Sequence, residues 1–86
     1  MKNSDWYVYI VKCKDDSLYT GISNSVEERV KKHNLGKGSK SIVKSIRPVE
    51  LVYVERFENR SEASKRESEI KKLSRKDKKQ LVNLGP

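Results

Sequence analysis

The fold of this chain is limited above all by a continuous run of apolar and aromatic residues at positions 6–11 (WYVYIV). β-Branched and aromatic residues without polar alternation are typical of a strand that is buried on both faces of a sheet. Residues 14–17 (KDDS) favour a turn, and residues 18–22 (LYTGI) predict a second strand that completes a β-hairpin. Gly21 in this strand indicates either a bulge or a close approach of another group to the backbone.

A helix is predicted directly after the hairpin. Residues 25–28 (SVEE) have the pattern of a capping box. In this motif the Ser25 hydroxyl accepts from the third helical amide, and the Glu28 side chain reaches back to accept from the Ser25 amide. The helix should end near Leu35, with Gly36 as its left-handed terminator. A basic loop is then expected over residues 36–47.

The second half of the chain predicts one more strand and two more helices. Residues 50–57 (ELVYVERF) form an apolar and aromatic run with acidic and basic positions, which indicates a more exposed strand. Asn59 or Ser61 is expected to cap a helix that runs to about residue 73. Ser74 is expected to cap a short, strongly basic helix that ends near residue 82.

Size and composition favour a single domain over residues 1–86, because a chain of this length buries only roughly 60–65% of its unfolded surface. No apolar stretch approaches the ~20 residues of a membrane span, and residues 1–5 lack the apolar segment of a secretory signal. The one cysteine, Cys13, provides neither an intrachain disulfide nor a zinc site. We therefore expect a cytoplasmic protein without a membrane partner.

Charge gives the first indication of a partner. Twenty Lys and Arg against twelve Asp and Glu give a formal net charge of +8 and a pI near 9.7. Such a balance favours a polyanion, because each neutralised phosphate releases a condensed counterion. The alternative is a lysine-rich surface that only aids solubility. Basic residues concentrate in two stretches: residues 29–47 carry seven and no acid, and residues 71–79 carry six with one acid.

Two predicted helices turn polar side chains inward. At about 100° per residue, His33 shares a stripe with two apolar residues of the first helix, and Arg29 lies at its margin. Glu67 lies between Ala63 and Ile70 on the inner stripe of the second helix. A buried carboxylate is costly unless it is paired or binds a cation. An ion pair of Glu67 with Arg29 or Lys71 is the alternative to a cation site, and a satisfied core or helix-end position is the alternative for His33.

The ordered motifs resemble those of the GIY-YIG nuclease superfamily, which includes the amino-terminal nuclease domain of the UvrC excision-repair protein. The resemblance rests on residues 7–9 (YVY), 19–21 (YTG), 29–34 (RVKKHN) and Glu67. It is nearest to the small stand-alone bacterial proteins of the YhbQ type, which share the GKGSK, RPVEL and KKLSR segments, and it covers about residues 6–82. Tyr7 stands where a glycine is usual, and Thr20 replaces an isoleucine.

The resemblance implies an α+β fold, a three-stranded antiparallel sheet flanked by helices, in agreement with the β-β-α-β-α-α order derived from the residues. It implies that one of Tyr9 and Tyr19 takes a proton from the attacking water while the other orients water or phosphate. A tyrosine has an unperturbed pKa near 10, so a nearby cation must favour the phenolate.

The resemblance also implies roles for Arg29, Glu67 and His33. Arg29 would clamp the phosphate and stabilise its developing charge. Glu67 would hold one Mg²⁺ or Mn²⁺ that polarises the phosphate. His33 matches a histidine that would donate a hydrogen bond or shuttle a proton.

Several lysines are candidates for contacts with nucleic acid phosphates. The loop over residues 36–40 either cradles a phosphate or only stops the helix. The candidates are Lys32, Lys37, Lys40, Lys44, Lys71 and Lys72.

We expect a metal-dependent endonuclease that hydrolyses DNA in preference to RNA, in repair or processing, directed by structure or ends with poor sequence specificity. The alternative is a nucleic-acid-binding module of the same fold with little or no cleavage activity. A protein-interaction domain would explain neither the inward polar groups nor the charge.

Overall fold

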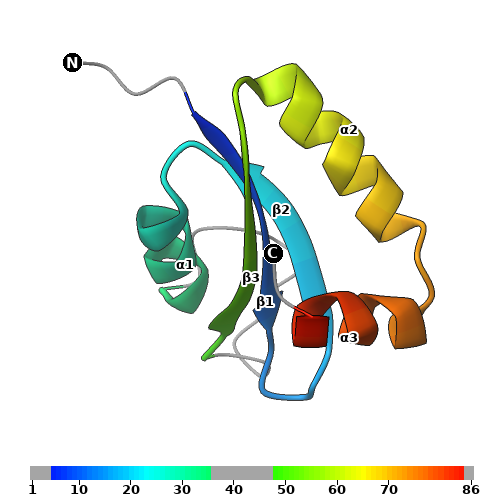
Figure 1. Cartoon of the computed structure of the whole chain (residues 1–86). Helices are drawn as coiled ribbons and strands as arrows, with labels where there is room; N and C mark the ends of the chain where they lie inside the picture. Colours follow the sequence, from blue (N-terminus) through cyan, green and yellow to red (C-terminus); the bar gives the residue numbers. More distant parts are fainter. Residues whose placement is uncertain (1–4, 36–47, 85–86) are drawn as a thin grey trace.

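The computed structural model describes residues 5–35 and 48–84 of the chain, and Figure 1 shows their arrangement. The chain forms strands β1 (Trp6–Lys12) and β2 (Leu18–Ser23), helix α1 (Val26–Asn34), strand β3 (Glu50–Phe57), and helices α2 (Arg60–Lys71) and α3 (Arg75–Leu84). The strands make one antiparallel sheet in the order β2-β1-β3. The predicted α+β class and the β-β-α-β-α-α order are confirmed.

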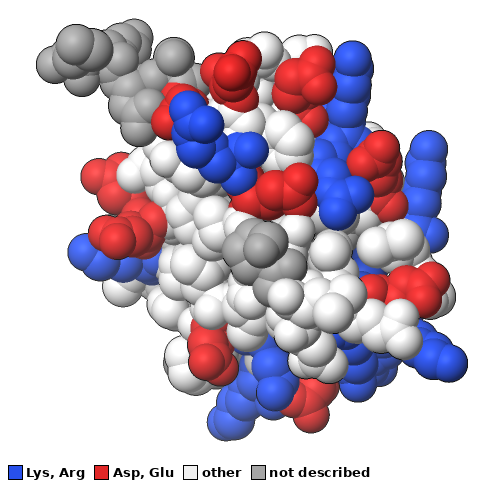
Figure 2. All heavy atoms as spheres, viewed as in Figure 1, with Lys and Arg blue, Asp and Glu red and all other residues white. Residues whose placement is uncertain are grey.

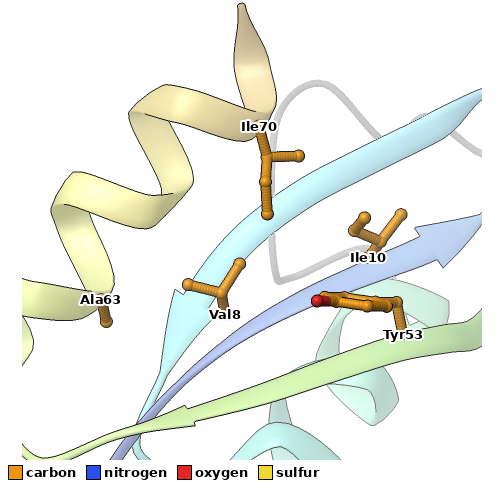
Figure 3. Close-up of a cluster of buried hydrophobic side chains, with 5 residues drawn as sticks. All are labelled: Val8, Ile10, Tyr53, Ala63 and Ile70. Atoms are coloured by element: carbon orange, nitrogen blue, oxygen red, sulfur yellow. The ribbon is translucent and has the colours of Figure 1, made fainter. Parts of the chain in front are cut away.

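The central strand β1 is buried on both faces, as its unbroken apolar run predicted. Helix α1 lies on one side of the sheet, and α2 and α3 lie on the other (Figure 1). On the α2 side, Val8 and Ile10 of β1 join Tyr53, Ala63 and Ile70 in a buried cluster (Figure 3). A second buried cluster on the α1 side is formed by Tyr9, Val11, Cys13 and Val49. Alternate residues of one strand therefore supply two separate cores.

The hydrogen bonds at the helix starts correct one prediction and settle another. Ser25 precedes α1 as expected, but its side chain makes no capping hydrogen bond within the described residues. The Ser25 amide instead donates to the Ser23 hydroxyl at 2.9 Å. This bond occupies the amide that Glu28 was expected to accept from, so the capping-box prediction is wrong. For α2 the cap is Asn59, whose Oδ1 accepts from the Glu62 amide at 2.9 Å.

The helix ends were predicted to within a few residues. Ser74 Oγ accepts from the Asp77 amide at 3.1 Å and caps α3, which continues to Leu84 rather than to residue 82. Helix α2 ends at Lys71, short of residue 73. Helix α1 ends at Asn34, and the expected terminator Gly36 lies outside the described residues.

One side chain joins the end of α1 to the start of β3. Asn34 Oδ1 accepts from the Val49 amide at 2.6 Å, and Asn34 Nδ2 donates to the Val49 carbonyl at 3.4 Å. Because these bonds link residues fifteen positions apart, they fix α1 against the sheet independently of the segment between them. The face of α1 that carries Arg29 and His33 is thereby held in place.

Candidate active site at the edge of strand β2

Tyr9 and Tyr19 lie on the α1 side of the sheet. In the β1–β2 register Tyr9 is opposite Gly21, and Val11 is opposite Tyr19. Since alternate residues share a face, both tyrosines point toward α1, as the hairpin predicted. Their neighbouring positions place the two phenol groups close together on one face of the sheet, with Tyr9 buried and Tyr19 partly buried.

Gly21 is required by the position of the Tyr9 ring. A Cβ on Gly21 would lie 2.7 Å from the Tyr9 hydroxyl oxygen and 2.8 Å from Cζ. Of the two predicted explanations for this glycine, the close approach is correct. The β1–β2 register is continuous, and the irregularity in the sheet falls between Ile10 and Val11 in the pairing with β3. The Tyr9 ring thus lies across the edge strand β2 and directs its hydroxyl toward the edge of the sheet.

His33 contacts both tyrosines. Its side chain is fully buried, and Nε2 lies 2.9 Å from the Tyr9 hydroxyl oxygen, within hydrogen-bonding distance. The Tyr19 ring meets the imidazole edge-on, with centroids 5.2 Å apart. Nδ1 is also buried and has no hydrogen-bond partner among the described residues. A buried, hydrogen-bonded histidine in the last turn of α1 agrees with the alternative of a satisfied core or helix-end position, so the catalytic role of His33 stays a prediction.

Burial and charge keep both members of this pair neutral near pH 7. Burial lowers the pKa of His33, and the neighbouring Arg29 guanidinium lowers it further. Burial raises the pKa of Tyr9; Arg29 acts in the opposite direction, and the charges of Tyr19 and Glu67 add to the increase. The resting state is therefore a phenol hydrogen-bonded to a neutral imidazole.

Arg29 adds a positive charge with unused hydrogen-bonding capacity. It lies on α1, one turn before His33, and is partly buried. Its Nε atom is fully buried and finds no partner among the described residues. A buried donor without a partner costs about 1–3 kcal/mol. An anionic ligand with acceptor oxygens would satisfy it.

Glu67 approaches the same edge from the opposite side of the sheet. It lies on α2 between the buried residues Ala63 and Ile70, as the helical stripe predicted. Its carboxylate is 3.3 Å from Lys71 Nζ, and its side chain remains 23% exposed. Of the two ion-pair partners considered for Glu67, the structure therefore shows Lys71. The charges of Arg29 on α1 and of Glu67 on α2 both act on the pKa of Tyr9, so these two residues act on it from helices on opposite sides of the sheet.

The chemistry of Glu67 fits one divalent cation held jointly with substrate. No group of three His, Cys, Asp or Glu side chains that could hold a metal occurs within the described residues. Mg²⁺ is commonly held by one or two carboxylates together with substrate phosphates and waters. A single, partly exposed carboxylate matches that type of site, and not a cage built by the protein alone.

The candidate phosphate-binding lysines divide into two groups. Lys32 on α1 and Lys71 and Lys72 at the end of α2 are exposed, although Lys71 is paired with Glu67. Lys37, Lys40 and Lys44 lie outside the described residues, as does the loop at 36–40. On the face shown in Figure 2, basic and acidic side chains are interspersed, so that face presents no continuous basic surface.

A cleft beside Arg29 contains residues that the sequence did not single out for a functional role. Its volume is about 260 Å³, and Arg60 Cζ lies 5.3 Å from the centroid of the Trp6 ring within it. The residues that line it are Trp6, Ile22, Ser23, Asn24, Arg29 and Arg60. The sequence predicted only that Trp6 belongs to a buried strand. The other residues of the cleft come from distant segments of the chain, and the sequence pattern does not show that these segments meet.

A larger cleft lies at the opposite end of the sheet, between the β1–β2 turn, the start of β3 and α3. It measures about 540 Å³ and is lined by residues such as Lys12, Glu50 and Lys79. None of the five predicted catalytic residues borders it. Size alone does not favour this cleft, and the β2 edge remains the candidate site because Tyr9, Tyr19 and His33 are in contact there.

Comparison with known proteins gives a consistent family. The family model described as the GIY-YIG catalytic domain matches residues 5–80. A UPF0213 protein of Staphylococcus saprophyticus is 56% identical over 79 residues, which cover 92% of this chain and 95% of that protein.

Two solution NMR structures are also similar. A UPF0213 protein from Bacillus halodurans has 46% identity and a TM-score of 0.61, over 93% of this chain and 84% of that one. A protein from E. faecalis has 41% identity and a TM-score of 0.64, over 98% and 90%. The family predicted from the tyrosine, arginine, histidine and glutamate motifs is confirmed.

Proposed function

The chain belongs to the GIY-YIG family of nuclease domains, and we propose that it is a metal-dependent endonuclease that hydrolyses DNA phosphodiester bonds. The observation that carries the proposal is the buried Tyr9–His33 hydrogen bond beside the unpartnered Arg29 Nε. Phosphodiester hydrolysis requires a base for water and positive charge for the phosphate. In this proposal the Tyr9–His33 pair would serve as the base and Arg29 would supply the positive charge.

Tyr9 and His33 together act as the general base in this proposal. A raised pKa disfavours a free Tyr9 phenolate. With the imidazole proton on Nδ1, however, His33 Nε2 accepts the phenolic proton while Tyr9 takes one from water. The proton moves from water to Tyr9 and from Tyr9 to His33, and no isolated phenolate accumulates. Tyr9 is thus the proposed base, and Tyr19 orients the water or the phosphate beside the imidazole edge.

Arg29 and Glu67 provide the charge. The Arg29 guanidinium donates to the phosphate oxygens, which satisfies its buried Nε and opposes the charge that develops in the transition state. Glu67 would hold one Mg²⁺ or Mn²⁺, which supplies Lewis-acid stabilisation of the phosphate and leaving oxygen. An incoming phosphate also offsets the positive charge that His33 gains.

The substrate is proposed to be DNA in preference to RNA, recognised by structure or ends with poor sequence preference, in repair or processing. Contacts from Arg29 and from exposed lysines such as Lys32 and Lys72 would go to phosphates, which carry no direct sequence information. No helix within the described residues is long and apolar enough to cross a bilayer. A cytoplasmic location remains our prediction.

Cleavage by matched variants tests the proposal. Purified protein is incubated with labelled single-stranded, duplex and branched DNA and with RNA, with and without Mg²⁺ or Mn²⁺. We expect metal-dependent cleavage that Arg29→Ala and Glu67→Gln abolish. Glu62→Gln is the control, because Glu62 is on the same helix and pairs with Lys65 at i+3 as Glu67 pairs with Lys71 at i+4.

Two results would contradict the nuclease proposal. Cleavage that survives Glu67→Gln unchanged would indicate a contaminating nuclease. Binding without cleavage on every substrate would favour the second candidate, a binding module of the same fold. The observation that favours this candidate is the Lys71–Glu67 ion pair, which already neutralises the proposed metal ligand.

A further inference from the structure

The cleft lined in part by Trp6, Asn24, Arg29 and Arg60 lies next to the proposed reactive groups. These residues come from the start of β1, the β2–α1 connection, α1 and the first turn of α2. Arg29 belongs both to this cleft and to the surroundings of Tyr9 and His33. A ligand that occupies the cleft would therefore be continuous with a phosphate held at the site.

The charges of the cleft favour an anion. Two arginines line it, and none of its lining residues is acidic. Neither Arg29 nor Arg60 forms an ion pair with a residue in the described part of the chain. The buried Arg29 Nε, which has no partner among the described residues, is a donor that the phosphate of a bound nucleotide would satisfy.

The aromatic side of the cleft indicates that the bound anion carries a flat aromatic group. Trp6 is partly buried against the α2-side core, and the Arg60 guanidinium lies over its ring. Nucleobases stack on aromatic rings and on guanidinium planes. The Asn24 side chain is exposed at the cleft and offers an amide donor and an acceptor.

We propose that this cleft holds one unpaired nucleotide next to the cleaved phosphate, with its base stacked against the Trp6–Arg60 pair. In a duplex the faces of the bases are covered by their neighbours, so only a single-stranded segment can supply such a base. The volume of about 260 Å³ lies just below the roughly 300–1,000 Å³ of clefts that hold drug-sized ligands. The inference rests on the proposed function, and it narrows the substrate to nucleic acid with an unpaired region.

Fluorescence of the single tryptophan reports on the cleft directly. Trp6 is the one Trp of the sequence, so quenching of its emission follows stacking without a competing signal. In EDTA, where cleavage is suppressed, we expect a short oligothymidylate to quench Trp6 and a blunt duplex of equal length to leave it nearly unchanged. Equal quenching by both ligands would overturn the proposal.

Affinity measured by anisotropy of labelled oligothymidylate separates stacking from charge. Trp6→Leu retains apolar contact with the core and removes the stacking surface, so affinity should fall roughly five-fold to one-hundred-fold. Trp6→Phe should recover part of the loss. Circular dichroism and urea unfolding of each variant show whether the fold is retained.

Arg60→Gln tests the cleft without altering a core residue. It should reduce the dependence of log affinity on log salt by up to about 0.7, the value for one neutralised phosphate on a single strand, because replacing the guanidinium that stacks on the base also removes positive charge near the phosphate. Arg75→Gln is the matched control, because Arg75 is also exposed and is the first residue of its helix. Unchanged affinity in Trp6→Leu, or an equal effect of the two arginine substitutions, would contradict the assignment.

The binding and cleavage experiments distinguish failure of the nucleotide-cleft proposal from failure of the nuclease proposal. If no substrate is cleaved with Mg²⁺ or Mn²⁺ but Trp6 is quenched selectively by single strands, the nuclease proposal is wrong and the nucleotide cleft stands. If DNA is cleaved but Trp6→Leu neither weakens binding nor slows cleavage, the nuclease proposal stands and the cleft is not a nucleotide site.

Discussion

Replacing Gly21 with alanine should disturb Tyr9 in a way that a second substitution can reverse. The added Cβ would lie 2.7 Å from the Tyr9 hydroxyl oxygen and 2.8 Å from Cζ, closer than real Cβ contacts allow. Tyr9 is 1% exposed and bonded to His33, so its ring cannot move aside freely. Overpacking of this kind costs about 1–3 kcal/mol of unfolding free energy.

The backbone effect of Gly21→Ala on the free energy of unfolding has the opposite sign to the steric effect. Gly21 does not adopt a positive φ, so alanine fits its backbone and lowers the entropy of the unfolded chain, a gain of about 0.4–1 kcal/mol. We therefore expect Gly21→Ala to destabilise the protein by up to about 2.6 kcal/mol, the upper limit of the difference between these two effects. Cleavage should fall by up to about 100-fold, since displacement of a reacting group by about 1 Å has that consequence.

A double-mutant cycle identifies the cause. Leucine at position 9 lacks the hydroxyl and Cζ atoms that the new Cβ would meet. In the Tyr9→Leu background, Gly21→Ala should therefore be neutral or stabilising by about 0.4–1 kcal/mol. Urea unfolding of the four proteins, followed by circular dichroism, measures the coupling. An equal effect of Gly21→Ala in both backgrounds would refute the steric explanation.

Two further predictions concern stability. The pKa of His33 is lowered in the folded state, so as the pH falls the unfolded chain binds the proton first. The free energy of unfolding should therefore decrease as the pH drops below about 6.5, the pKa of histidine in the unfolded chain. The total loss is about 1.4 kcal/mol for each unit by which folding lowers the pKa. In urea titrations at several pH values His33→Gln should flatten this dependence, and an unchanged slope would contradict the assignment. Asn59→Ala should cost about 0.5–2 kcal/mol because it removes the α2 cap. Ser61→Ala, at an exposed position in the same turn, should have little effect, and equal losses from the two would argue against the cap.

The sequence predicted the fold well because its elements are specified locally. The buried run of β1, the cap at Asn59 and the cap at Ser74 each depend on residues close together in the chain. The capping box failed for a local reason as well, since a four-residue motif does not include the Ser23 hydroxyl that takes the Ser25 amide. A short motif predicts a helix start more securely than it predicts the bonds that form there.

The site was predicted as a set of residues and not as an arrangement. Helical spacing placed Glu67 between two core residues and His33 on an inner stripe, and both placements are correct. The Tyr9–His33 bond depends on the β1–β2 register and on the ring crossing Gly21, which no single segment specifies. The approach of Glu67 from the opposite face likewise follows from tertiary packing alone.

Single-turnover cleavage by Tyr9→Phe, His33→Gln and the double variant tests the proposed proton path most directly. If Tyr9 passes its proton to His33, each single substitution should slow metal-dependent cleavage severely, and the double variant should be no slower than the worse single one, because residues that act as one unit are not additive. Tyr9→Phe with wild-type cleavage, or multiplicative losses in the double variant, would contradict the paired role of Tyr9 and His33.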